Sequence, residues 1–223
     1  MVKRKVMWEF YVFSAAITAL ILFIGIYFGI SLSRGKIEEL QSELTKLKLR
    51  QEDLMFEISL LNLDKNVSCN LLGKAIQSVM EEAGRLGERV SLYETSEKIK
   101  YEEFESLKKE YTLTLVRYWF YVEEMKRSCN RSDLVTVLFF YSNKDCSDCS
   151  IQGTILTYWK QKYPKNLMIF ALDYDLDLNI ISILKDIYKV EKVPSVVLNG
   201  KNYEGLIKLE DLGEILCSEH NLC

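Results

Sequence analysis

Apolar and polar positions divide the chain into stretches with different periods. Residues 10–33 contain no charged side chain, and an apolar run of that length can cross the roughly 30 Å hydrocarbon core of a bilayer as a helix. We therefore expect a transmembrane helix at 10–33, preceded by a basic tail at 1–9. A retained anchor is favoured over a cleaved signal peptide, because the run is long and no Ala-x-Ala site follows it.

The next segment carries apolar residues in alternating steps of three and four. This heptad pattern predicts a coiled-coil stalk at 36–63. Its apolar seam is Ile37, Leu40, Leu44, Leu47, Leu54, Ile58 and Leu61, with Gln51 as a polar member. Two arrangements stay open: the stalk pairs two chains into a homodimer, or it packs as an amphipathic helix against its own chain.

Helical periodicity returns after an interruption at 64–68 and predicts a helical hairpin at 69–128. The first arm contains two glycines near its end and is followed by polar residues, so we expect a turn at 91–98. The second arm, at 97–127, is apolar on several sides over residues 111–122. We therefore expect that arm to pack on two fronts, one of them the distal part of the chain.

From residue 134 onward, short runs of β-branched and aromatic residues alternate with helical patterns. The expected elements are strand 134–141, helix 146–162, strand 167–173, helix 178–189, strand 195–199, strand 201–204 and helix 207–218. The first two strands are joined through a helix and should be parallel, whereas the last two form a hairpin at an Asn-Gly turn. The expected fold class is α/β: a C-terminal mixed four-stranded sheet with flanking helices, after a transmembrane helix and a helical stalk.

Composition and charge mainly exclude functions. Lys and Arg number 29 against 32 Asp and Glu, for a net charge of −3, so no basic surface suggests a nucleic-acid partner. The single histidine, His220, argues against a His-rich metal site or a Cys-His nucleophile pair. We expect no metal, no cofactor and no nucleic acid.

An acidic run, Asp173-Tyr-Asp-Leu-Asp177, follows the second expected strand. Clustered carboxylates invite the hypothesis of a cation site. No glycine or distal glutamate completes a Ca²⁺ loop, however. We therefore predict an ordinary solvated loop.

Two of the six cysteines form a C-x-x-C motif, Cys146-Ser-Asp-Cys149, where a strand runs into a helix. Unpaired N–H groups and the dipole at a helix N-terminus favour a thiolate, so Cys146 is the predicted nucleophile. Asp145 and Asp148 place negative charge beside the thiols and oppose this effect. We expect a weak oxidant, or a reductase or isomerase.

The C-x-x-C motif and the later segment Val193-Pro194-Ser195 together resemble the thioredoxin superfamily over residues 134–223. The resemblance implies that Pro194 is cis and lies beside the disulfide, and that the segment's backbone at Val193 binds a substrate chain. It also implies that Cys146 attacks a partner disulfide and that Cys149 then resolves the mixed disulfide.

The chain departs from the thioredoxin pattern in several places. Asp145 stands where thioredoxin has a tryptophan, Ser147-Asp148 replaces its Gly-Pro dipeptide, and its buried acid on the preceding strand would fall at Phe140. Because a fold does not establish an activity, two functions stay open. One is a membrane-anchored extracytoplasmic oxidoreductase that acts on protein thiols and disulfides, with an unidentified membrane or extracytoplasmic redox partner. The other is a redox-inert thioredoxin-like binding or assembly module on a tethered stalk.

The other four cysteines are expected to form structural disulfides, Cys69 with Cys129 and Cys217 with Cys223. Six cysteines permit other pairings, so these remain hypotheses. An even number of cysteines persists best in an oxidising compartment. Since basic residues lie on both sides of 10–33, the cysteines decide the expected orientation: a cytoplasmic N-terminus and an extracytoplasmic C-terminal domain.

Overall fold

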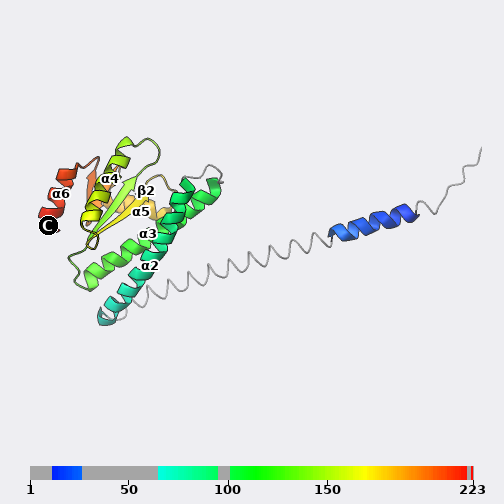
Figure 1. Ribbon diagram of the computed structural model, residues 1–223, viewed down its shortest axis with the longest axis horizontal. Helices are drawn as coiled ribbons and strands as arrows, with labels where there is room; N and C mark the ends of the chain where they lie inside the picture. Colours follow the sequence, from blue (N-terminus) through cyan, green and yellow to red (C-terminus); the bar gives the residue numbers. More distant parts are fainter. Residues whose placement is uncertain (1–11, 27–64, 95–100, 220–221, 223) are drawn as a thin grey trace, which may run out of the picture. The chain divides into compact units, whose positions relative to one another are not determined.

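The computed structural model describes residues 12–26, 65–94, 101–219 and 222. The chain divides into two units, Met1–Leu60 and Leu61–Cys223. In the first unit, residues 12–26 form a helix (Figure 1). The side chains of this helix are exposed. The coiled coil expected at 36–63 lies outside the described residues.

The expectation of a single-pass membrane protein is contradicted. Among the helices of the described ranges, none is both long enough and apolar enough to cross a membrane. Within the apolar run at 10–33, the structure describes a helix over residues 12–26. The remainder of that run lies outside the described residues.

The second unit alternates helices and strands after a pair of long helices. Its elements are α2 (Lys65–Glu94), α3 (Tyr101–Ser128), β1 (Val135–Tyr141), α4 (Ser147–Lys162), β2 (Leu167–Asp173), α5 (Asn179–Tyr188), β3 (Ser195–Leu198), β4 (Lys201–Glu204) and α6 (Leu209–Ser218). The strands form one sheet in the order β2-β1-β3-β4. β1 is parallel to β2 and antiparallel to β3, and β3 is antiparallel to β4. The predicted mixed four-stranded sheet with flanking helices is confirmed.

Helices cover both faces of this sheet (Figure 1). On one face, α3 and α5 pack over Leu138 and Phe140 of β1. On the other face, α4 and α6 pack over Val137 and Phe139. Successive side chains of a strand point to opposite faces, so a strand covered on both sides needs a continuous apolar run. This burial explains the mainly apolar sequence of β1, in which Thr136 is the exception.

α2 and α3 pack together as a helical hairpin (Figure 1). The turn expected at 91–98 is wrong where the chain is described, because α2 continues to Glu94. Packing explains the difference: a Cβ atom at Gly87 would lie 3.2 Å from the hydroxyl of Tyr111. Gly87 therefore leaves room for the Tyr111 ring of α3 and does not end α2.

The second arm of the hairpin packs on two fronts, as its sequence predicted. Tyr121 is 1% exposed and lies in a cluster with Leu72 and Val79 of α2. The next residue, Val122, is also 1% exposed and joins the core between α3 and the sheet. α3 thus packs against α2 on one side and the sheet on the other.

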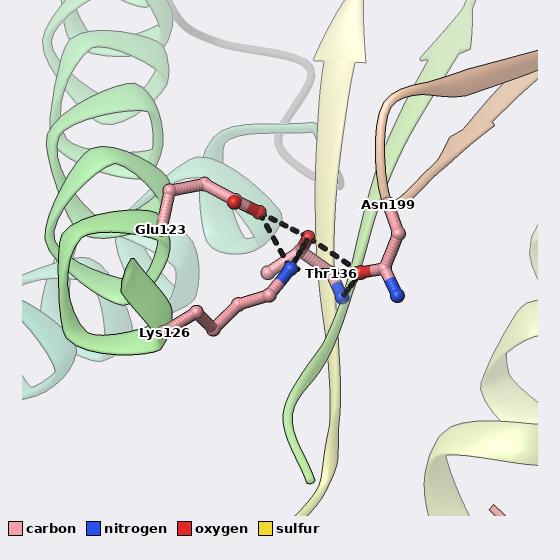
Figure 2. A network of polar contacts seen from close by, with 4 residues as sticks. All are labelled: Glu123, Lys126, Thr136 and Asn199. Atoms are coloured by element: carbon pink, nitrogen blue, oxygen red, sulfur yellow. Dashed lines mark hydrogen bonds and ion pairs between the residues drawn. The ribbon is translucent and has the colours of Figure 1, made fainter. Parts of the chain in front are cut away.

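A polar network also connects α3 to the sheet (Figure 2). Lys126 Nζ donates to Thr136 Oγ1 at 3.1 Å and to Asn199 Oδ1 at 2.8 Å. The backbone N–H of Thr136 donates to Asn199 Oδ1 at 3.0 Å, and its hydroxyl donates to Glu123. The network joins α3, β1 and the turn between β3 and β4.

Candidate functional site

Cys146 and Cys149 form a disulfide at the start of α4. β1 ends at Tyr141, a short loop follows, and Cys146 is the N-cap residue of the helix. The first N–H groups of a helix have no intrahelical partner, and together with the helix dipole they favour negative charge. Sulfur at Cys146 therefore lies where a thiolate would be stabilised.

The two cysteines of this disulfide differ in solvent exposure. Cys149 is buried, with 6% of its surface exposed. Cys146 is partly exposed. A large partner therefore reaches Cys146 more readily than Cys149.

A cavity of about 370 Å³ lies beside the disulfide. Its lining residues are Phe139, Tyr141, Ser142, Asn143, Lys144, Cys146, Cys149, Ser150 and Ala171. The Phe139 and Tyr141 rings stack with their centroids 5.7 Å apart, and Ala171 is the β2 partner of Phe139. None of these lining residues carries a carboxyl group, and the sheet side of the cavity is apolar.

The residues of β1 that line the cavity are Phe139 and Tyr141. The resemblance to thioredoxin places the buried acid of that family at the position of Phe140. Phe140, however, is fully buried on the opposite face of the sheet, with Leu138 and Leu172. Strand alternation accounts for the difference, because a one-residue offset exchanges the two faces. The aromatic side chain beneath the cysteines is thus one position earlier than expected.

Hydrogen bonds hold the loop between β1 and α4. Ser142 Oγ donates to Asp175 Oδ2 at 2.6 Å and accepts the backbone N–H of Lys144 at 3.0 Å. The backbone N–H of Cys146 donates to the carbonyl of Lys144 at 2.7 Å. The loop that leads to the first cysteine is therefore tied to the segment after β2.

Asp173, at the end of β2, forms a buried ion pair with Lys108 of α3. The two residues are 7% and 8% exposed. The prediction of a solvated loop is therefore wrong at Asp173, because α3 reaches the end of the sheet and supplies a cation. Sequence reasoning missed Lys108, although it lies one helical turn from Thr112, which is also buried.

The segment Val193-Pro194-Ser195 lies at the carboxyl end of β1. The Val193–Pro194 peptide bond is cis, and Ser195 is the β3 partner of Phe140. The carbonyl of Pro194 accepts the N–H of Gly205 at 2.8 Å. The β3 ladder begins at Ser195, so the backbone of Val193 precedes the paired part of the strand.

The remaining cysteines are distant from this motif in the sequence. A disulfide joins Cys69 in α2 to Cys129, just after α3. Cys217, in α6, is disulfide-bonded. Cys223 lies outside the described residues.

Comparisons with known proteins find similarity at the level of structure. No family model matches the chain, and no curated protein is similar to it. One solved structure, described as that of a malarial protein, is 23% identical with a TM-score of 0.33 and covers 39% of this chain and 97% of its own. A thioredoxin-2, described as a component of the malaria parasite's protein secretion machinery, is 23% identical with a TM-score of 0.32 and covers 37% of this chain and 81% of its own.

The fold and the site by themselves define a class of protein. It is an α/β domain with a C-x-x-C disulfide at the start of a helix. A cis proline precedes the strand that pairs with β1.

Proposed function

We propose that the domain is a thioredoxin-like thiol–disulfide oxidoreductase that exchanges disulfides with protein substrates through Cys146 and Cys149. The observation that carries the proposal is the disulfide at the N-terminus of α4, where one cysteine is accessible and the other is buried. Ser195 pairs with Phe140 near the carboxyl end of β1, and in this proposal Val193, Pro194 and Ser195 bind the backbone of the substrate.

In the proposed reaction, the reduced domain enters with two thiols. The Cys146 thiolate attacks one sulfur of a client disulfide, forms a mixed disulfide and releases the other client sulfur as a thiolate. The Cys149 thiolate then attacks Cys146, which releases the client's first sulfur and closes the Cys146–Cys149 disulfide. The client gains two electrons and two protons, and a thiol reductant must supply these again before the next turnover.

The charge around the motif supports a weak oxidant rather than a strong one. Asp148 lies in the first turn of α4 and, with Asp145 before the motif, places negative charge beside the thiols. Negative charge near a thiolate disfavours it and makes the reduced form less stable. Both side chains are exposed, so salt screens part of this effect.

The proposal is tested by insulin reduction with dithiothreitol as the reductant. The full chain should accelerate the reaction, Cys146→Ser should abolish the acceleration, and Cys149→Ser should accumulate a mixed disulfide with insulin. The double variant Cys69→Ser/Cys129→Ser is the matched control and should retain turnover, because that disulfide lies outside the motif. Equal rates for the wild type and Cys146→Ser would contradict the proposal.

A redox-inert thioredoxin-like binding or assembly module is the second candidate. The lining of the cavity favours it in one respect, because no carboxyl group there is available to exchange a proton with Cys149. The same insulin assay distinguishes the two candidates. An inert module would show neither turnover nor a mixed disulfide in the Cys149→Ser variant.

A further inference from the structure

The buried ion pair of Lys108 and Asp173 lies beside the proposed exchange site but takes no part in the exchange steps. The Lys108 ammonium is 5.7 Å from the centroid of the Tyr141 ring, and Tyr141 lines the cavity together with both cysteines. Asp173 follows Ala171 by two residues and therefore shares its strand face. Ala171 also lines the cavity. Both members of the ion pair are thus linked to the cavity by a neighbouring residue.

Hydrogen bonds continue from this ion pair to the first cysteine. Asp173 Oδ1 accepts the backbone N–H of Asp175 at 2.9 Å, and the Asp175 carboxylate accepts the hydroxyl of Ser142 at 2.6 Å. Ser142 and Lys144 complete the path to the backbone N–H of Cys146. The path begins on α3, a helix that precedes the whole sheet in the sequence.

Other charged side chains near the motif are more accessible to water. On the loop and on α4 these are Lys144, Asp145 and Asp148, and Asp175 follows β2; all of them are exposed. Exposed charges are screened by salt, whereas buried charges are screened much less. The Lys108 and Asp173 charges nearly cancel while both are present. Removal of either one would leave a buried charge whose field reaches the thiols.

We propose that Lys108 is a positioning residue of the dithiol site, contributed by the helical hairpin. Its ammonium balances Asp173, so that the Cys146 thiolate forms beside a neutral pair and the loop to Cys146 stays tied to the end of β2. The inference rests on the proposed function, since it concerns the thiolate that performs the exchange. It adds a residue outside the C-x-x-C domain to the site.

The test measures the pH dependence of Cys146 alkylation by iodoacetamide in the reduced full chain, with the modified peptide quantified by mass spectrometry. Lys108→Met leaves an unbalanced carboxylate and should raise the midpoint, whereas Asp173→Asn leaves an unbalanced ammonium and should lower it. Two charges about 10 Å apart at an effective dielectric constant of about 20 correspond to a change of about one pH unit. The double variant Lys108→Met/Asp173→Asn should return close to the wild-type midpoint.

Midpoint changes of opposite sign in the two single variants indicate an electrostatic role. A merely structural role would change both midpoints in the same direction. Arg117→Met is the control, because Arg117 of α3 forms a partly buried ion pair with Glu82 of α2. This control should leave the midpoint unchanged. If Lys108→Met does not fold, the nearly isosteric Asp173→Asn decides alone.

An unchanged or raised midpoint in Asp173→Asn overturns the inference. A lowered midpoint in Lys108→Met overturns it as well. Alkylation needs no client protein, so its result is independent of insulin turnover. A domain that fails to reduce insulin but shows opposite midpoint changes would retain the inference and lose the proposed function.

Discussion

Single residues decide how closely α4 and α6 approach each other. A Cβ atom at Gly213 of α6 would lie 2.6 Å from the Trp159 ring of α4. Trp159 is 7% exposed, and its indole N–H donates to the carbonyl of Leu209 at 3.2 Å. The ring cannot move aside without loss of this hydrogen bond. Glycine at 213 is therefore required by packing, although it lies inside a helix.

We expect Gly213→Ala to lower the free energy of unfolding by about 1–3 kcal/mol, because the added methyl group overpacks the contact with Trp159. Gly84→Ala in α2 is the matched control, since nothing lies within 4 Å of the added Cβ atom. Alanine has the higher helix propensity, so that control should gain up to about 1 kcal/mol. Urea unfolding of both variants checks the opposite signs, and stabilisation by Gly213→Ala would refute the packing argument.

Elements are joined by polar contacts as well as by packing, and Thr136 is the central member of the network in Figure 2. It is 3% exposed, yet its hydroxyl and backbone connect α3, β1 and the turn between β3 and β4. The sequence showed only a threonine within an apolar strand. Its partners are far away in the chain, so no local pattern could have identified them.

We expect Thr136→Val to lower the free energy of unfolding by about 1–3 kcal/mol, because the buried hydroxyl of Thr136 loses its hydrogen bonds to the charged groups of Glu123 and Lys126. Valine keeps the β-branched shape that suits a strand. Thr157→Val on the exposed side of α4 is the control, since its hydroxyl bonds only the carbonyl of Gly153 in the same helix. That control should change stability by about 0.5 kcal/mol or less. Equal effects of the two variants in urea unfolding would count against the network.

At the scale of the second unit, the hairpin and the sheet depend on α3. This helix packs against α2 on one side and the sheet on the other. The arms have nearly equal lengths, with 30 residues in α2 and 28 in α3. The open ends of the hairpin therefore meet, and the Cys69–Cys129 disulfide joins them.

The Cys69–Cys129 disulfide closes a loop with a sequence separation of 60. Replacement of both cysteines by serine should lower the free energy of unfolding by up to about 4 kcal/mol, since the unfolded chain regains the entropy of that loop. The matched variant Cys146→Ser/Cys149→Ser opens a ring with a separation of three and should lose about half as much. Guanidinium unfolding of the full chain compares the two. A larger loss for the inner pair would contradict this account.

The sequence by itself determined the local features of the second unit. Apolar runs and turn residues predicted the order of strands and helices from residue 134, and the C-x-x-C spacing placed Cys146 at a helix start. Each of these depends on neighbours along the chain, whose periodicity and turn chemistry are visible in one sequence. The membrane-spanning helix expected at 10–33 is not supported, because no helix within the described residues is both long enough and apolar enough to cross a membrane.

Only the tertiary structure decided which distant residues meet. It placed Phe139 rather than Phe140 beneath the cysteines, because the face of a strand depends on its register in the sheet. It extended α2 to Glu94, because Tyr111 of α3 packs at Gly87. It also brought Lys108 to Asp173, where a buried lysine and a buried aspartate are stable only as partners. Such pairings are set by packing between elements, which no periodicity along the chain records.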